Sequence, residues 1–259
     1  MRPYILSVTV EKGGVGKTTT VVNAAAILAA KGFKSLIIDV DPQAYATAYF
    51  GMYSDDLPGV YEVMTQRAEI QKVIRQTPYE NLDILPSTFA LDAIETYIAA
   101  IPCGQEFVLS DAISPIKNEY DFIFIDCPAA GQRIKVNAMT ASTHLILPLI
   151  PDDYAIQCLR QTSKSLVNIR RSVNQNLQVL GVLLTLDERT ANKKAYSAAL
   201  KNQTIFHCFQ QTIRKNTMLS EAINSHKPVI YYAKKSIGAA DYTAFAEEML
   251  TELGEKNLR

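Results

Sequence analysis

The residues best suited to chemistry lie in the stretch VTVEKGGVGKTTT, residues 8–20. A strand-like apolar run precedes its glycines and a helix-like segment follows them, which is the setting of a phosphate-binding loop. Gly13, Gly14 and Gly16 let the backbone curl so that several N–H groups point toward an anion, and the helix that follows adds its positive end. Lys17 would then contact the outer phosphates of a nucleotide, and the hydroxyl of Thr18 would hold Mg²⁺.

The loop departs from the usual phosphate-loop pattern G-x-x-x-x-G-K-[ST] at its first position. Glu11 stands where that pattern has glycine, and a second lysine, Lys12, comes just before the glycine pair. The residues alone leave open whether this is a damaged site, a chance match or a variant loop that uses the extra lysine.

Carboxylates end two further buried runs. In LIIDVDPQ, residues 36–43, the acids are Asp39 and Asp41, and in FIFIDCP, residues 122–128, the acid is Asp126. Apolar residues followed by an acid are typical of a strand that delivers a carboxylate to the carboxyl edge of an open α/β sheet, where ligands bind. Such acids can hold a magnesium-bound water or orient an attacking water, so together they indicate a nucleotide hydrolase.

Alternating strands and helices would position these groups. Continuous apolar runs predict strands buried on both faces, as in a parallel sheet. We therefore expect one domain over residues 1–259, with a doubly wound, mostly parallel α/β sheet flanked by helices. The expected strands are 4–10, 35–40, 82–85, 121–126, 143–149 and 179–186, and the expected helices are 17–30, 91–100, 106–118, 154–173, 191–202 and 239–253.

Composition narrows the class of protein. The 259 residues are 48% apolar and 20% charged, with 26 basic and 26 acidic side chains. The halves differ, because residues 151–259 contain 15 Lys and Arg against 10 Asp and Glu, so a basic face in the second half is possible. Four scattered cysteines and an N-terminal apolar run too short for a signal peptide or membrane span predict a cytoplasmic protein.

Four motifs in order, KGGVGKTTT, DVDPQAYAT, YDFIFIDCP and LSEA, resemble the ParA family of P-loop ATPases with a deviant Walker A motif. The resemblance extends from about residue 4 to 253. In that family the lysine before the glycine pair is the signature residue, so the resemblance implies that the loop is a variant rather than a damaged one. It implies an ATP-binding set of Lys12, Gly13, Gly14, Val15, Gly16, Lys17, Thr18 and Thr19.

The resemblance also implies roles. Lys12 would reach across an ATP-sandwiched homodimer to the partner's phosphates, much as an arginine finger does. Asp41 would position the attacking water, Asp39 would support the magnesium shell, and Asp126 would be the Walker B acid, with Thr18 on the metal. The protein would be a slow Mg²⁺-dependent ATPase whose ATP dimer binds duplex DNA without sequence preference and is released by a ParB-like adaptor. It would be cytoplasmic and nucleoid-associated.

The DNA-facing part shows departures from the family. Arg189 is kept, with Lys193 and Lys194 one helical turn further on. Lys215 stands for one family arginine, with Arg214 beside it, but Met218 replaces a second arginine that usually contacts DNA. Ala130 also replaces the usual serine after the Walker B acid. We expect no sequence-specific operator binding, because no helix-turn-helix extension precedes the first strand.

Other members of the superfamily remain as alternatives. A MinD-like membrane switch is disfavoured, because the C-terminal helix has Glu247, Glu248 and Glu252 beside its apolar residues and an anionic lipid surface would repel it. Iron–sulfur members use paired interface cysteines or CxxC, which this chain lacks. An ATPase that positions protein cargo on the nucleoid cannot be separated from DNA partition by sequence.

Overall fold

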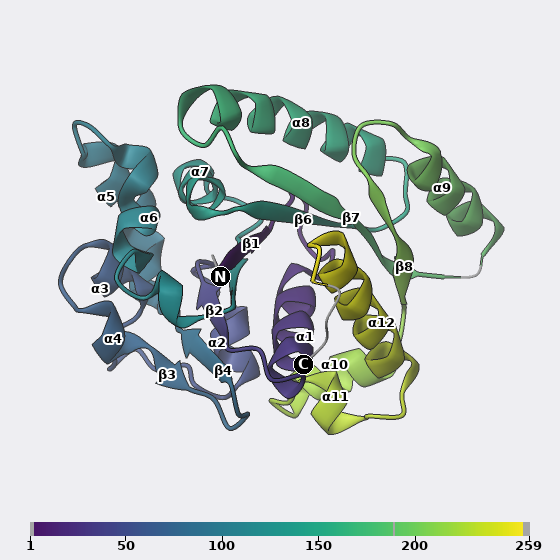
Figure 1. The fold of residues 1–259 in the computed structure, drawn as a ribbon, viewed down its shortest axis with the longest axis horizontal. Coiled ribbons are helices and arrows are strands. Elements are labelled where there is room, and N and C mark those ends of the chain that lie inside the picture. Colours follow the sequence, from purple (N-terminus) through teal and green to yellow (C-terminus); the bar gives the residue numbers. More distant parts are fainter. Residues whose placement is uncertain (1–2, 189, 256–259) are drawn as a thin grey trace.

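The computed structural model describes residues 3–188 and 190–255. The described residues form one eight-stranded sheet in the order β3-β4-β2-β5-β1-β6-β7-β8 (Figure 1). All neighbours pair in parallel except β3, which is antiparallel to β4. The strands are β1 (Tyr4–Val8), β2 (Ser35–Asp39), β3 (Arg75–Gln76), β4 (Leu82–Leu85), β5 (Phe122–Asp126), β6 (His144–Leu149), β7 (Gln178–Asp187) and β8 (Cys208–Arg214).

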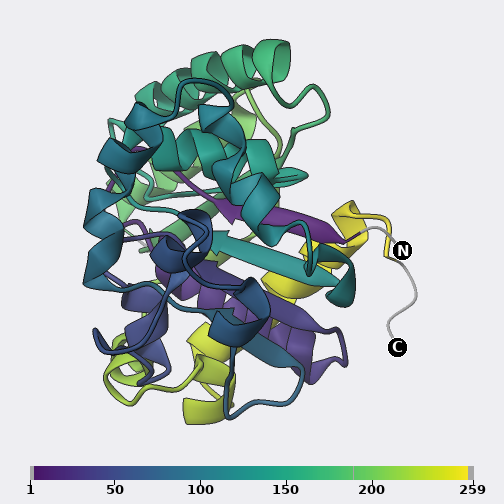
Figure 2. The same ribbon diagram turned by 90° about the vertical axis from the view of Figure 1, so that its left-hand side faces the viewer.

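Helices cover both faces of this sheet, as Figures 1 and 2 show. On one face lie α1 (Lys17–Ala30), α2 (Tyr45–Tyr49), α10 (Thr217–Asn224), α11 (Val229–Tyr232) and α12 (Ile237–Glu252). The other face is covered by α3 (Val60–Met64), α4 (Ile70–Val73), α5 (Ile94–Ala100), α6 (Val108–Ile113), α7 (Gln132–Ala141), α8 (Ala155–Ser172) and α9 (Ala191–Asn202). Short 3-10 turns are η1 (Phe89–Ala93), η2 (Gln105–Phe107) and η3 (Lys117–Glu119).

Side-chain alternation explains why the strands are apolar at consecutive positions. In β1, Leu6 and Val8 pack into the core on the α1 side, whereas Ile5 packs into the core on the α5 side. A strand covered on both faces must be apolar on both, and the expected doubly wound, mostly parallel fold is confirmed.

The helix expected over residues 106–118 is wrong in detail. The chain forms η2 and α6 there, and α6 ends at Ile113. Pro115 follows two residues later, and proline lacks the N–H group that a continued helix would need. The edge strand β8 and the helix α7 were not predicted. The C-terminal helix α12 is docked in the core as expected, with Phe245, Met249 and Leu250 buried.

Parallel pairing brings the sequence motifs to one edge of the sheet. The phosphate loop follows β1, and β5 lies between β1 and β2. Asp126 at the end of β5 is in register with Val8 on one side and Asp39 on the other. The two buried acids therefore end adjacent strands beside the glycine loop.

Candidate functional site

The loop between β1 and α1 has the backbone of a phosphate-binding loop. Gly14 and Gly16 take positive φ values of 70° and 83°, in the left-handed region that glycine adopts without strain. Thr185 of β7 fixes the loop from below, because its hydroxyl donates to the Val15 carbonyl at 2.8 Å. The N-terminus of the 14-residue helix α1 then opens directly at the loop, where backbone N–H groups attract an anion.

Lys17 is the first residue of α1 and is buried, with 7% of its surface exposed. Its Nζ donates to the Lys12 carbonyl at 3.0 Å, so the ammonium lies within the curl of the loop. Burial lowers the pKa of Lys17, against the charge of Asp126, which raises it. A buried ammonium held by one neutral carbonyl is well suited to an anionic ligand.

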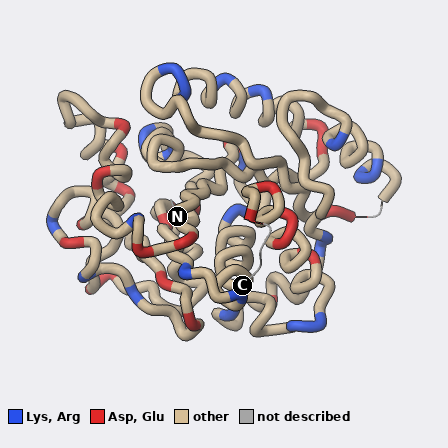
Figure 3. The backbone as a smooth tube through the Cα atoms, viewed as in Figure 1, with Lys and Arg blue, Asp and Glu red and all other residues tan. Residues whose placement is uncertain are grey.

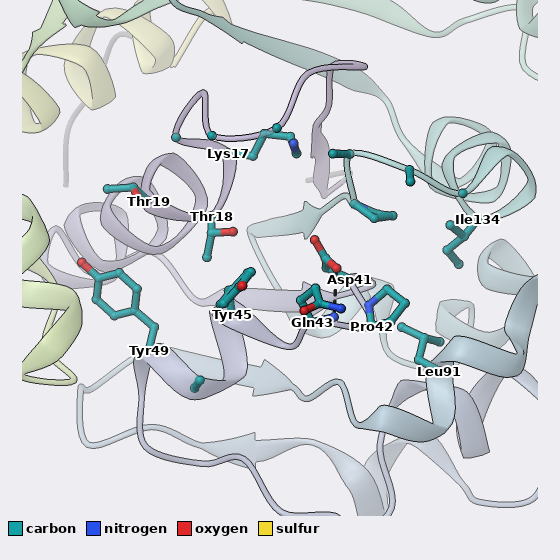
Figure 4. A pocket seen from close by; sticks show the side chains of 18 of the residues that line it. Lys17, Thr18, Thr19, Asp41, Pro42, Gln43, Tyr45, Tyr49, Leu91 and Ile134 are labelled. Atoms are coloured by element: carbon teal, nitrogen blue, oxygen red, sulfur yellow. Dashed lines mark hydrogen bonds between the residues drawn. The ribbon is translucent and has the colours of Figure 1, made fainter.

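A cavity of about 1060 Å³ opens at this edge of the sheet. In Figure 4, Lys17 and Thr18 lie on one side of it and Asp41 and Gln43 on the other. Of the predicted ATP-binding and catalytic residues, seven line the cavity: Gly13, Gly14, Gly16, Lys17, Thr18, Thr19 and Asp41. The other two, Lys12 and Val15, belong to the same loop but do not line the cavity.

The far wall of the cavity was not foreseen from the sequence. Tyr49, Ile223 and His226 line it, from α2 and the end of α10. His226 is held by a hydrogen bond of 2.6 Å between its Nδ1 and the Ala48 carbonyl. No short motif marks these residues, because they come from unconnected segments that the fold brings together.

Asp39 is completely buried and fully hydrogen-bonded. One oxygen accepts the Asp41 N–H at 3.1 Å, and the other accepts both the N–H and the hydroxyl of Thr47 at 2.8 Å each. Burial raises the pKa of Asp39 to about 6, against these hydrogen bonds. Asp39 therefore fixes the loop that presents Asp41, whose own carboxylate accepts the Gln43 N–H at 3.0 Å.

Asp126 is buried to the same degree, yet neither of its oxygens has a hydrogen-bond partner among the described residues. Burial, and next the charge of Asp39, raise the pKa of Asp126 well above its usual range. A buried carboxylate without partners is costly unless a cation or water satisfies it. Oxygen ligands are those that Mg²⁺ prefers, so Asp126 and the hydroxyl of Thr18 fit a magnesium site at the phosphate loop.

Lys12 points away from its own loop. Its Nζ forms an ion pair with Asp152, and it lies over the ring of Tyr154 at 5.8 Å from the centroid. The sequence did not point to Asp152, which comes three residues after β6 ends at Leu149, whereas Asp39 and Asp126 are the last residues of β2 and β5. A search for acidic residues within a few positions after each expected strand would have identified Asp152.

Glu95 is a second residue that the sequence did not reveal. Its carboxylate accepts the N–H groups of Arg133 at 3.2 Å and Ile134 at 3.0 Å, and so caps the N-terminus of α7. Gly131, just before this helix, has a φ of 90° and no side chain that could cap it. Since residues 128–131 line the cavity, α5 fixes one wall of the site through Glu95.

The residues predicted to face DNA lie around the carboxyl ends of β7 and β8. Lys193 and Lys194 are in the first turn of α9, and Lys194 is exposed. Arg214 binds Asp241 with Nε and Nη2, and Lys215 pairs with Glu188 at 2.6 Å. Arg189 lies outside the described residues. The positive charges of Arg214 and Lys215 are therefore largely offset within the chain.

Comparison with known proteins agrees with this site. The fold and the glycine loop define a P-loop nucleotide-binding protein, and a family model described as an AAA domain matches residues 4–179. The sporulation initiation inhibitor protein Soj of Bacillus subtilis is 36% identical over 95% of this chain and 97% of its own length. The chromosome partitioning protein ParA of Myxococcus xanthus is 33% identical over 95% and 87%. The chain belongs to the ParA/MinD family of P-loop ATPases.

Solved structures give the same result. Cobyrinic acid a,c-diamide synthase from Mycobacterium smegmatis with ADP and magnesium superposes with a TM-score of 0.86, at 27% identity over 99% of this chain and 97% of that one. The septum site-determining protein MinD from Pyrococcus horikoshii with Mg-ADP has a TM-score of 0.79, at 27% identity over 98% and 99%. Within the described residues, no helix has both the length and the apolar character that a membrane crossing requires.

Proposed function

We propose that this chain, as a single P-loop ATPase domain, is a slow Mg²⁺-dependent ATPase that acts as a dimerising switch in DNA partition. The observation that carries the proposal is the convergence on one cavity edge of a buried lysine, a buried carboxylate without partners and a second carboxylate on a fixed loop. Relatives named as partitioning proteins and a neighbour with bound ADP and magnesium support the choice of ATP, Mg²⁺ and partition.

Each residue would contribute one part of the hydrolysis. The loop N–H groups and Lys17 would hold the phosphates, while Thr18 and Asp126 would hold Mg²⁺, which neutralises the charge developing on the outer phosphates. Asp41 would orient the attacking water, at a position that Asp39 fixes through the Asp41 N–H. Lys12, which lies at the outer side of the loop, would leave Asp152 and stabilise the phosphates of the partner subunit.

The proposed role in partition depends on the binding of DNA by the dimer. Two copies of a basic surface around Arg189, Lys193 and Lys194, with Arg214 and Lys215 alongside, would bind duplex DNA regardless of sequence and so place the protein on the nucleoid. A ParB-like adaptor that stimulates hydrolysis would then release it. A cargo-positioning ATPase would use the same site, whereas a membrane switch is not supported by a C-terminal helix that is docked in the core.

The proposal is tested with Asp41→Ala. This variant should bind ATP with near wild-type affinity, lose hydrolysis and accumulate as a dimer, because binding groups are intact and only the orientation of water is lost. Sedimentation velocity with ATP and with ADP, together with phosphate release, measures all three. A variant that hydrolyses ATP at the wild-type rate, or that stays monomeric with ATP while the wild type dimerises, would contradict the role given to Asp41.

A further inference from the structure

The helix α8 carries positive charge that nothing in the proposed site uses. Its 18 residues contain Arg160, Lys164, Arg170 and Arg171 and no acidic residue. The adjoining helix α9 contains Lys193, Lys194 and Lys201 in 12 residues, again without an acid. The whole chain has equal numbers of basic and acidic residues, so two neighbouring helices with seven cations and no anion depart from its average.

Three of these cations form a row. Arg160, Lys164 and Arg171 are exposed, and their spacing of four and seven residues places them on one side of α8. The row extends about 16 Å at 1.5 Å per residue. Within the described ranges 3–188 and 190–255, none of the three has a carboxylate partner within 4.0 Å.

The row continues onto α9. Tyr196, in the second turn of α9, donates a hydrogen bond to Asp153, two residues before α8 begins, so the N-terminal half of α9 lies beside the start of α8. Figure 1 shows α8 across the top of the molecule with α9 beyond its right-hand end, and in Figure 3 the α8 segment carries blue and no red. The two acids at the start of α8 are already engaged, Asp152 with Lys12 and Asp153 with Tyr196.

We propose that the row Arg160, Lys164 and Arg171 on α8 binds the phosphodiester backbone of duplex DNA and extends the α9 surface into one continuous contact. This inference rests on the proposed function. The free positive charge lies here rather than at Arg214 and Lys215, which have carboxylate partners of their own. Phosphates spaced along a strand match separate, unpaired cations and need no base contact.

The chemistry of the same face favours DNA over a lipid surface. A helix that lies on a membrane inserts a row of large apolar residues. Val167 is the only exposed large apolar side chain of α8, and the exposed residues beside the row include the polar Gln161 and Asn168. The face thus offers charge and hydrogen-bond donors, as a phosphate backbone requires.

Matched alanine variants test the inference in the full chain with ATP and Mg²⁺. Lys164→Ala and Arg171→Ala are compared with Lys117→Ala, an exposed lysine in η3, outside α8 and α9, and with Lys193→Ala in α9. Binding of two unrelated duplexes is followed by fluorescence anisotropy over a range of salt. Each lost phosphate contact should weaken binding about eightfold at 0.1 M salt and reduce the magnitude of the salt slope by about 0.9, on both duplexes alike.

The outcomes separate this inference from the proposed function. Wild-type protein that binds neither duplex at low salt contradicts DNA binding altogether. If the wild type binds and Lys193→Ala weakens it, while Lys164→Ala and Arg171→Ala behave like Lys117→Ala, DNA binding stands and the role of α8 is wrong. The role of α8 is equally wrong if the two variants keep DNA binding and lose binding to vesicles of anionic lipid.

Discussion

Asp39 and Asp126 end adjacent strands in register, and both are completely or almost completely buried, yet the structure predicts opposite effects of the same substitution. Asp39 accepts three hydrogen bonds, whereas Asp126 accepts none among the described residues. Asp39→Asn replaces an acceptor by an amide N–H group that faces the N–H donors of Asp41 or Thr47. Asp126→Asn removes a buried carboxyl that no hydrogen bond among the described residues satisfies.

The magnitudes follow from the hydrogen bonds. Loss of a buried acceptor that leaves its donors unsatisfied costs about 1–3 kcal/mol, so Asp39→Asn should lower the free energy of unfolding by about that amount. Asp126→Asn should raise it by about 1–3 kcal/mol without metal, since the cost of burying a carboxyl without hydrogen-bond partners is removed. Burial raises the pKa of Asp39 to about 6, against 3.8 for a carboxyl in the unfolded chain. The carboxyl therefore contributes stability that is fully present below about pH 4 and is lost as the pH rises through 6.

Urea denaturation with EDTA, and again with Mg²⁺ and ATP, measures both effects. In EDTA, Asp126→Asn should be more stable than wild type and Asp39→Asn less stable. With Mg²⁺ and ATP the wild type should gain stability, and Asp126→Asn should lose most of that gain because its metal ligand is absent. If Asp126→Asn were destabilised in EDTA and kept the full stabilisation by Mg²⁺ and ATP, the assignment of Asp126 as a metal ligand would be refuted.

Three further predictions concern the loop. Lys17→Ala should weaken ATP binding by at least about tenfold in calorimetry, since one charge-assisted contact contributes about 1.5–3 kcal/mol, and unchanged affinity would contradict the phosphate-loop assignment. Gly13→Val should still bind ATP but remain monomeric in sedimentation. A Cβ at this position would meet only Ala129, at 3.9 Å, within its own subunit, but it would crowd a facing subunit. An ATP-dependent dimer of the variant would refute this. Asp152→Asn should strengthen ATP-dependent dimerisation by up to about fivefold by freeing Lys12 from a partly exposed pair, and weaker dimerisation would show that the pair supports the dimer.

The sheet and the phosphate loop were predictable because local chemistry determines them. Runs such as residues 36–38 and 122–125 are apolar on consecutive positions, which only a strand buried on both faces requires. The edge strand β8, with the sequence CFQQTIR, was not predicted because its polar residues break that pattern. It is a strand because it pairs with β7 on one side. The helix α7 begins after a glycine with no capping side chain, and the carboxylate that caps it comes from Glu95, 38 residues away from Arg133.

Within the candidate site, the sequence pointed to both buried acids but did not show that they differ in hydrogen bonding. Asp39 and Asp126 each follow a buried apolar run, and only the fold shows that Thr47 and the Asp41 N–H satisfy one of them. The same limit applies to the basic residues. Arg214 and Lys215 are cations in the sequence, but Asp241, 27 residues after Arg214, and Glu188 lie against them in space.

The ion pair of Lys12 with Asp152 fits a lysine that acts on a partner subunit. The two side chains keep 27% and 30% of their surface exposed, and pairs this accessible to water contribute only about 0–1 kcal/mol. A contact from the same ammonium to a phosphate in a closed interface is charge-assisted and contributes about 1.5–3 kcal/mol. With nucleotide bound, Lys12 would therefore gain free energy by leaving Asp152 for the partner's phosphate. Without nucleotide, it would stay paired with Asp152. On this argument Lys12 would add its charge to the phosphates only in the proposed dimer, which would give the departure from the usual loop at residue 12 a physical reason.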